Sequence, residues 1–125
     1  MTAWTTDELG KIDAADELEI ASVRPDGTLR NPTTIWVARL GDDLYVRSVN
    51  GRTGSWFRGT QDRHEGHIRA GGVDKDVTFV DPDPDIDDQI DDAYRTKYRR
   101  YAPRIVGSIL TPGARSATLK LVPRE

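Results

Sequence analysis

The sequence of 125 residues contains no cysteine and one methionine, and it has no long hydrophobic run. The absence of cysteine excludes disulfide bonds and a thiol nucleophile. No apolar stretch approaches the roughly 20 residues that a membrane span needs. The first residues, MTAWTTD, carry neither the basic nor the apolar segment of a signal peptide. We therefore expect a cytoplasmic protein that has no membrane partner.

An excess of positive charge is also lacking. The chain has 18 Lys and Arg against 21 Asp and Glu, which gives a net charge of -3. This balance does not favour binding to nucleic acid, so any anion must be bound by a local cluster of residues. With 36% hydrophobic residues, the chain has the size and composition of one globular unit with one core. We expect residues 1–125 to form a single domain.

Stringent catalytic and nucleotide-binding motifs are missing as well. The sequence has neither the G-x-x-x-x-G-K-[ST] phosphate loop nor G-x-G-x-x-G, and it has no G-x-S-x-G turn. A serine nucleophile at Ser48 or Ser55 would need a positioned base, which no motif provides. We therefore expect no catalytic side chain.

Two clusters of potential metal ligands are better explained by structural roles. His64 and His67 would lie on opposite faces of a strand, which disfavours a shared metal ion. Three acidic residues, Asp81, Asp83 and Asp85, imitate the start of a calcium loop. That loop needs glycine at a position that Ile86 occupies here. We interpret these acids as favourable charge at a helix N-terminus and expect no metal site.

The hydrophobic pattern predicts mainly β structure with flanking helices. Strands are expected at 18–23, 33–40, 44–48, 65–70, 75–80 and 117–122, and a weaker apolar segment covers 105–110. Thr5 and Glu8 can form a capping box that begins a first helix. A short helix is expected near 54–60. Turns are expected at 24–27 and at 71–72, where glycine accepts positive φ.

The most regular helical pattern follows Pro84 and ends near Pro103. The apolar and aromatic residues on its face include Ile90, Tyr94, Tyr98 and Tyr101. At this spacing we interpret the tyrosines as core or dimer contacts. The order of elements predicts an α+β fold, in which an antiparallel sheet curls into a small barrel with helices packed outside.

An alternating strand runs directly into a polar loop between Leu44 and Arg58. Gly51 and Gly54 let the backbone turn and approach a ligand, and Arg47, Arg52 and Arg58 supply positive charge. The loop can therefore bind an anion. The alternative is an ordinary polar turn between a strand and a helix, because the spacing matches no stringent motif.

Several segments carry a resemblance to a known superfamily. Residues 17–22, 34–37, 44–52, 56–61 and 66–72 resemble a small bacterial branch of the split-barrel superfamily that binds flavin mononucleotide (FMN) or a deazaflavin coenzyme. Its members include pyridoxamine-phosphate-oxidase-like proteins and deazaflavin-dependent reductases. The likeness covers nearly the whole chain.

The resemblance implies a cofactor at a homodimer interface. The phosphate or ribityl chain would face Arg47, Ser48, Asn50, Arg52, Gly54 and Ser55, and the ring would lie near Thr33, Thr34 and Trp36. Trp56 would wall the pocket or belong to the core. The basic pair common in better known branches is reduced here to Arg52 within Arg-Thr-Gly-Ser, which leaves the choice of coenzyme open.

Two functions follow from this resemblance. The first is a homodimeric oxidoreductase that uses FMN or a deazaflavin to reduce or oxidise a small organic substrate. The second is a non-catalytic split barrel that binds such a cofactor or another phosphorylated molecule. A nucleic-acid-binding barrel is a weaker third option, because the charge balance opposes it.

Overall fold

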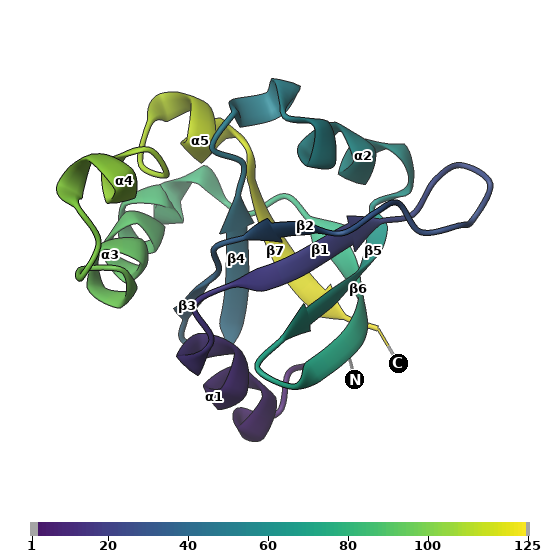
Figure 1. The fold of residues 1–125 in the computed structure, drawn as a ribbon, viewed down its shortest axis with the longest axis horizontal. Helices are drawn as coiled ribbons and strands as arrows, with labels where there is room; N and C mark the ends of the chain where they lie inside the picture. Colours follow the sequence, from purple (N-terminus) through teal and green to yellow (C-terminus); the bar gives the residue numbers. More distant parts are fainter. Residues whose placement is uncertain (1–2, 125) are drawn as a thin grey trace.

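The computed structural model describes residues 3–124, and its seven strands form one antiparallel sheet. The strands are β1 (Leu18–Ser22), β2 (Thr33–Ile35), β3 (Ala38–Leu40), β4 (Asp43–Arg47), β5 (Glu65–Ala70), β6 (Val73–Val80) and β7 (Thr118–Pro123). Their order is β2-β1-β5-β6-β7-β4-β3. Only Trp36 and Val37 separate the two edge strands in the sequence, so the sheet must curl to bring its edges together (Figure 1). The predicted α+β split barrel is confirmed.

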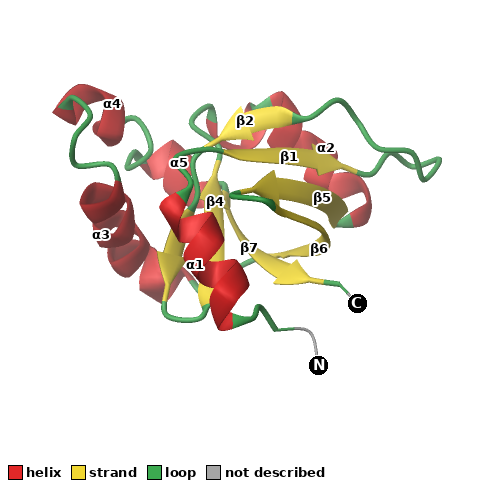
Figure 2. Cartoon of the chain, turned by 60° about the horizontal axis from the view of Figure 1, so that its bottom comes forward, coloured by secondary structure: helices red, strands yellow, loops and turns green. Residues whose placement is uncertain are grey.

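Helices lie around the outside of this curled sheet (Figure 2). They are α1 (Thr6–Ala14), α2 (Ser55–Arg63), α3 (Asp87–Lys97), α4 (Pro103–Gly107) and α5 (Pro112–Ser116), with 3₁₀ turns at Gly51–Thr53 and Pro84–Ile86. Helix α1 contacts β3 and β6, α2 contacts β1, and α3 contacts β3. The helices therefore cover the β3 edge and the β1 side of the barrel.

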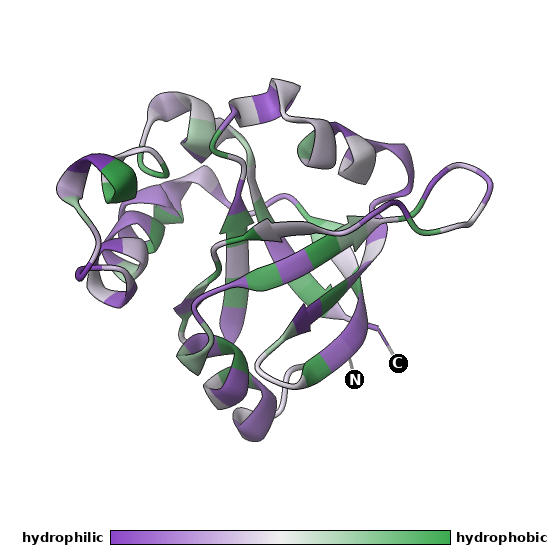
Figure 3. Ribbon diagram, in the orientation of Figure 1, coloured by the Kyte–Doolittle hydropathy of each residue, from purple (hydrophilic) through white to green (hydrophobic). Residues whose placement is uncertain are grey.

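The buried apolar side chains form two clusters. The first fills the barrel and includes Leu18, Ile20, Leu44, Val46, Phe57, Ile68, Val77 and Leu119. The second joins β3 and β4 to α3 and α4 and consists of Ala38, Tyr45, Ile90, Tyr94, Tyr98, Val106 and Ile109. Figure 3 shows hydrophobic bands along the strands beside mainly polar outer segments. Tyr94 and Tyr98 are fully buried, so their predicted core role is confirmed.

Local sequence signals explain how several elements begin and turn. Thr5 and Glu8 form the predicted capping box, since Glu8 N donates to Thr5 Oγ1 at 3.1 Å and Thr5 N to Glu8 Oε1 at 2.9 Å. Strands β5 and β6 pair up to Ala70 and Val73 and turn through two glycines. Gly71 and Gly72 have φ values of 58° and 87°, which suit a tight two-residue hairpin turn.

The prediction of one strand over 33–40 is wrong. The structure breaks it at Trp36 and Val37, so that β2 pairs with β1 while β3 pairs with β4. Helix α3 satisfies the backbone at the break: Val37 N donates to the Tyr98 hydroxyl at 3.1 Å, and Val37 O accepts from Lys97 Nζ at 3.0 Å. These long-range bonds replace the strand partners that a continuous strand would have used.

The C-terminal half also differs from its prediction in detail. The long helix ends at Lys97, short of Tyr101, and Pro84 belongs to a separate 3₁₀ turn before it. Residues 112–116, for which the sequence predicts no regular element, form α5 with Thr111 as its N-cap. Asp83 accepts a hydrogen bond from Asp85 N at 2.9 Å, which agrees with its interpretation as a capping acid.

Candidate functional site

Two pockets of about 280 Å³ each lie beside edge strand β2. Adjacent residues of a strand point to opposite sides. Accordingly, Thr34 lines one pocket and Thr33 lines the other. The first, called the apolar pocket, is lined by Thr34, Ile35, Trp36, Val49, Ile105 and Ile109, with Arg47 and Ser108. The second, called the basic pocket, is lined by Arg24, Arg30, Asn31, Thr33, Ser55 and Trp56, with Ile20 and Ser22.

The apolar pocket has a rigid aromatic wall and an exposed apolar rim. Trp36 stacks on Tyr98 with ring centroids 3.8 Å apart and planes 4° from parallel. Val49 and Ile105 are 51% and 43% exposed, which is unusual for residues of their size in this protein. Such a surface favours contact with a flat apolar group or a second protein surface.

The basic pocket lies at the start of α2. The N-cap residue is Gly54, which has no side chain to accept the first N–H groups of the helix. A helix start of this kind attracts anions, and two arginines add positive charge. Arg30 Nη2 lies 2.5 Å from Asp62 Oδ2, and Arg24 Nη1 donates to Leu29 O at 2.8 Å. One carboxylate therefore offsets part of this charge.

Arg30 also has an unsatisfied donor. Its Nε is buried and has no hydrogen-bond partner within residues 3–124. The neighbouring helix approaches closely, because a Cβ on Gly59 would lie 2.8 Å from Arg30 Nε and 2.5 Å from Ser22 Oγ. A buried N–H without an acceptor costs free energy. Because Nε is enclosed against Gly59, a ligand in the basic pocket would meet the exposed part of the Arg30 side chain, which is 34% exposed.

Arg47, predicted to face a phosphate, directs its charge into the protein. Its side chain is fully buried, Nε donates to Thr118 Oγ1 at 2.9 Å, and Nη1 pairs with Asp91. Asp91 also binds Arg115, whose Nε donates to it at 3.1 Å. Burial opposes ionisation of Asp91, but the hydrogen bonds from Arg115 and Arg47 outweigh it and lower its pKa.

The predicted loop residues beyond β4 line neither pocket, apart from Ser55 and Trp56. Arg52 Nη1 donates to Ser116 O at 2.8 Å, and its guanidinium lies over the Phe57 ring. Ser48 is buried, and a Cβ on Gly54 would lie 2.5 Å from its Oγ. The loop is thus folded against Ser48 and α5. Within the loop, the Thr53 hydroxyl donates to Asn50 O.

Six of the ten predicted site residues therefore line the two pockets. Thr33, Ser55 and Trp56 line the basic pocket, and Thr34, Trp36 and Arg47 line the apolar pocket; Ser48, Asn50, Arg52 and Gly54 line neither. Sequence reasoning missed Arg24, Arg30 and Asn31. They belong to the long connection between β1 and β2 that extends from the barrel (Figure 1), and only the basic character of that connection could have indicated them.

The histidines have other roles. His64 has φ 57° and ends α2 as its C-cap residue. His67 Nδ1 lies 2.7 Å from Asp76 Oδ1, and Nε2 contacts Asp74. Burial alone would lower the pKa of His67, but bonds to Asp76 and Asp74 raise it. No group of three or more potential metal ligands lies together within the described residues.

No helix within residues 3–124 is long and apolar enough to cross a membrane. The curled antiparallel sheet, with its edge strands two residues apart in the chain, defines the class of split-barrel proteins. Within it, the chain belongs to DUF2255, a family of uncharacterized proteins conserved in bacteria, whose model matches residues 8–121. No curated protein matches the chain at a significant level.

Solved structures with the same fold are distant in sequence. A conserved hypothetical protein from Mycobacterium tuberculosis has a TM-score of 0.61 and 11% identity, over 99% of this chain and 83% of that chain. An F420 reductase has a TM-score of 0.57 and 16% identity, over 92% and 90% of the two chains. The heme storage protein HutZ from Vibrio cholerae has a TM-score of 0.59 and 14% identity, over 96% and 90%. At these identities the likeness concerns the fold alone.

Proposed function

We propose that this protein binds FMN or a deazaflavin coenzyme along β2 and uses it to oxidise or reduce a small organic substrate. The observation that supports this most directly is the pair of adjacent residues Thr33 and Thr34, which belong to a basic and an apolar pocket. Each pocket is slightly smaller than the roughly 300–1,000 Å³ typical of small-molecule sites. A ligand with an aromatic ring and a phosphate would occupy both.

The basic pocket has the donors that a phosphate requires. Arg30 lines this pocket with a side chain that is 34% exposed, and α2 begins beside it at Ser55. Arg24 would add a second positive charge. A phosphate would form a charge-assisted hydrogen bond with the exposed end of the Arg30 guanidinium. The phosphate position in this proposal therefore depends on Arg30 and Ser55 rather than on Arg52.

The apolar pocket would hold the ring. A flavin or deazaflavin supplies hydride transfer when bound, and the protein contributes orientation and exclusion of water. Trp36 is fixed by its stacking on Tyr98, so it offers a rigid wall. Thr34 would provide a hydroxyl at the pocket edge. Arg47 would form part of the pocket wall and would not bind the ligand through its charge, since its guanidinium is paired with Asp91.

We also propose that a second copy of the chain covers this site. Strand β2 pairs only with β1 among the described strands, and Thr33 and Thr34 on it are exposed. Val49 and Ile105 extend the exposed surface at the apolar pocket. An uncovered strand edge next to apolar side chains favours association with another protein surface. A homodimer would bury both.

A non-catalytic binding function is the second candidate. Arg47 is the one charged residue of the apolar pocket, and it is already paired with Asp91. No residue of that pocket is therefore available as a general acid or base. Hydride transfer by the cofactor needs no general acid or base, and storage or transport of the cofactor would not need one either. Turnover of the loaded protein with a nicotinamide or dye acceptor separates the two functions.

Titration of the purified protein with FMN, and with oxidised and reduced deazaflavin coenzyme, tests binding. Replacing Arg30 with Gln removes the proposed phosphate donor. We expect it to weaken FMN binding by about 1.5 to 3 kcal/mol, or roughly 10- to 100-fold in Kd, the usual worth of a charge-assisted hydrogen bond. Riboflavin, which lacks the phosphate, should bind both proteins equally.

Arg52→Gln is the matched control, because it removes the same charge from a residue that lines neither pocket. We expect its affinity for FMN to equal that of the wild type. The opposite result, with a loss at Arg52 and none at Arg30, would place the phosphate on the loop after β4. Failure of all three ligands to bind at micromolar concentrations would exclude the cofactor proposal.

A further inference from the structure

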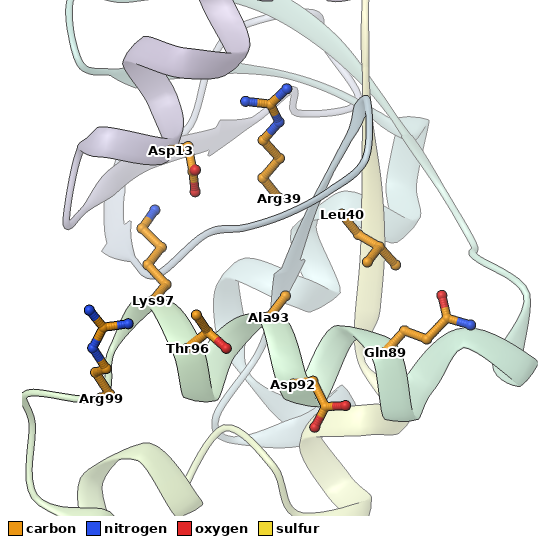
Figure 4. Close-up of a pocket in the computed structure, with 9 residues that line it drawn as sticks. All are labelled: Asp13, Arg39, Leu40, Gln89, Asp92, Ala93, Thr96, Lys97 and Arg99. Atoms are coloured by element: carbon orange, nitrogen blue, oxygen red, sulfur yellow. The ribbon is translucent and has the colours of Figure 1, made fainter.

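A further pocket, of about 660 Å³, lies between α1, β3 and α3 (Figure 4). It shares no lining residue with the apolar or the basic pocket. Its charged side chains are Arg39, Lys97 and Arg99, with Asp13 and Asp92. Figure 4 shows the Lys97 amine directed from α3 toward Asp13 on α1. This separate pocket is large enough for a metabolite.

Lys97 differs from the other lysines of the chain. Three lysines pair with carboxylates: Lys11 with Asp7 at 3.0 Å, Lys75 with Glu8 at 2.8 Å and Lys120 with Asp43 at 3.5 Å. Lys97 has no carboxylate partner in the part of the chain that the structure describes. Its side chain is half-buried, and this burial lowers its pKa. A larger share of its amine is therefore neutral and nucleophilic.

Lys97 must release one hydrogen bond to reach a ligand in the pocket. Lys97 Nζ donates to Val37 O at 3.0 Å. The Tyr98 hydroxyl also lies 3.3 Å from Val37 O, but its single proton has a shorter bond to Asp16 O, at 2.7 Å. When the amine turns into the pocket, Val37 O therefore loses its main donor, and binding of the ligand must offset that cost.

Two arginines of the pocket can recognise an anion. Arg39 Nε donates to Gly41 O at 2.8 Å, which fixes the side chain and leaves the two terminal nitrogens for a ligand. Neither Arg39 nor Arg99 forms an ion pair within residues 3–124. Asp92, by contrast, pairs with Arg95 at 3.0 Å. Asp13 also lines the pocket and forms no ion pair within residues 3–124, but the two arginines still leave an excess of positive charge near Lys97 that suits a carboxylate.

We propose that this pocket binds a small carboxylate that also carries an aldehyde or ketone, and that Lys97 Nζ bonds covalently to its carbonyl carbon. The neutral amine adds to the carbon, the carbonyl oxygen takes up two protons and leaves as water, and a C=N bond replaces C=O. In the overall balance both protons come from the amine nitrogen, so that a neutral amine and a carbonyl give a neutral imine and water, and one proton from the medium then gives the protonated imine. No oxidant or reductant is required.

Trapping with glyoxylate and sodium cyanoborohydride tests the proposal on the full chain. Reduction of the imine leaves carboxymethyl-lysine, which peptide mass spectrometry assigns to one lysine and separates from the α-amino group. We expect Lys97 to be labelled about tenfold faster than Lys11, Lys75 or Lys120, because its amine has no carboxylate partner within residues 3–124 and Arg39 would hold the glyoxylate carboxylate beside it. Lys97→Arg should remove the main adduct and leave FMN binding unchanged.

Arg39→Gln tests recognition of the carboxylate. We expect it to slow labelling of Lys97 by glyoxylate about tenfold, the loss of one charge-assisted bond. Labelling by acetaldehyde, which has no carboxylate, should stay the same, and this also shows that the variant is folded around Lys97. Equal labelling of all four lysines, or the same loss with both aldehydes, would overturn the proposal.

Discussion

Arg47 and Arg30 show how the surroundings of a guanidinium decide its role. Arg47 is 1% exposed, and Asp91, Thr118 and backbone carbonyls satisfy its donors. Arg30 is partly exposed, pairs with Asp62 through Nη2 and retains a buried Nε without a partner among the described residues. A guanidinium that is partly exposed can bind an additional anion, and a fully buried one cannot. At the scale of single residues, we therefore propose Arg30 rather than Arg47 as the phosphate ligand.

Asp91 should be important for stability, because it is the partner that both Arg47 and Arg115 share. Asp91→Asn would leave the buried Arg47 charge without its carboxylate. We expect the free energy of unfolding, measured by urea denaturation, to fall by about 3 to 5 kcal/mol. The lowered pKa of Asp91 also means that its stabilising effect is present above its ordinary pKa and is lost as the pH falls.

The neighbouring Asp92 is a matched control. It lies on the same helix, but its side chain is 76% exposed and, among the described residues, pairs only with the exposed Arg95. Asp92→Asn should change the free energy of unfolding by no more than about 0.5 kcal/mol. Equal effects of the two substitutions would contradict a specific role for the buried network.

At the scale of elements, close packing of α2 against the barrel determines the shape of the basic pocket. Gly59 lies in the middle of α2 and faces Ser22 of β1 and the Arg30 side chain. A larger residue would separate the helix from the strand. The shape of the basic pocket therefore depends on Gly59. Any residue could adopt its helical backbone conformation, but only glycine leaves room for Ser22 and Arg30.

Gly59→Ala should reduce stability, although alanine favours helices. The added Cβ would lie 2.5 Å from Ser22 Oγ and 2.8 Å from Arg30 Nε. We expect an overall loss of about 1 to 3 kcal/mol in the free energy of unfolding, as for other overpacked sites. Gly10→Ala in α1 is the control, since its Cβ would meet nothing within 4 Å. It should gain about 0.5 to 1 kcal/mol. A gain at both positions would show that α2 is not closely packed.

At the scale of the whole molecule, the proposed dimer depends on the exposed rim of the apolar pocket. Ile105→Glu would place a charge on this rim and should weaken self-association at least about tenfold, measured by analytical ultracentrifugation. Val80→Glu on β6 is the matched control, because Val80 is 40% exposed and lines neither pocket. A wild-type monomer at all concentrations, or equal effects of both variants, would contradict the proposed interface.

The local features of the fold could be predicted because each depends on neighbouring residues. The capping box at Thr5 and Glu8 and the glycine turn at 71–72 depend on contacts within a few positions. The break at Val37 could not be predicted, because Tyr98 and Lys97 reach it from 61 and 60 positions away. The same limit applies to the basic pocket: Thr33 and Ser55, which line it, were among the predicted site residues, but the position of Arg30 beside them could not be predicted.

The sequence by itself determined the split barrel, since alternating hydrophobic strands, turn glycines and capped helices all depend on short-range chemistry. Only the tertiary structure decided which charges face inward. Arg47 and Arg52 look equivalent in the chain, yet Asp91 satisfies the first and Ser116 O the second. Contacts between distant segments decide whether a side-chain N–H donor has an acceptor within the protein or remains available to a ligand. The spacing of hydrophobic residues carries no information about those acceptors. The same physical reason places Arg30 in the basic pocket and leaves Lys97 without a carboxylate partner within residues 3–124.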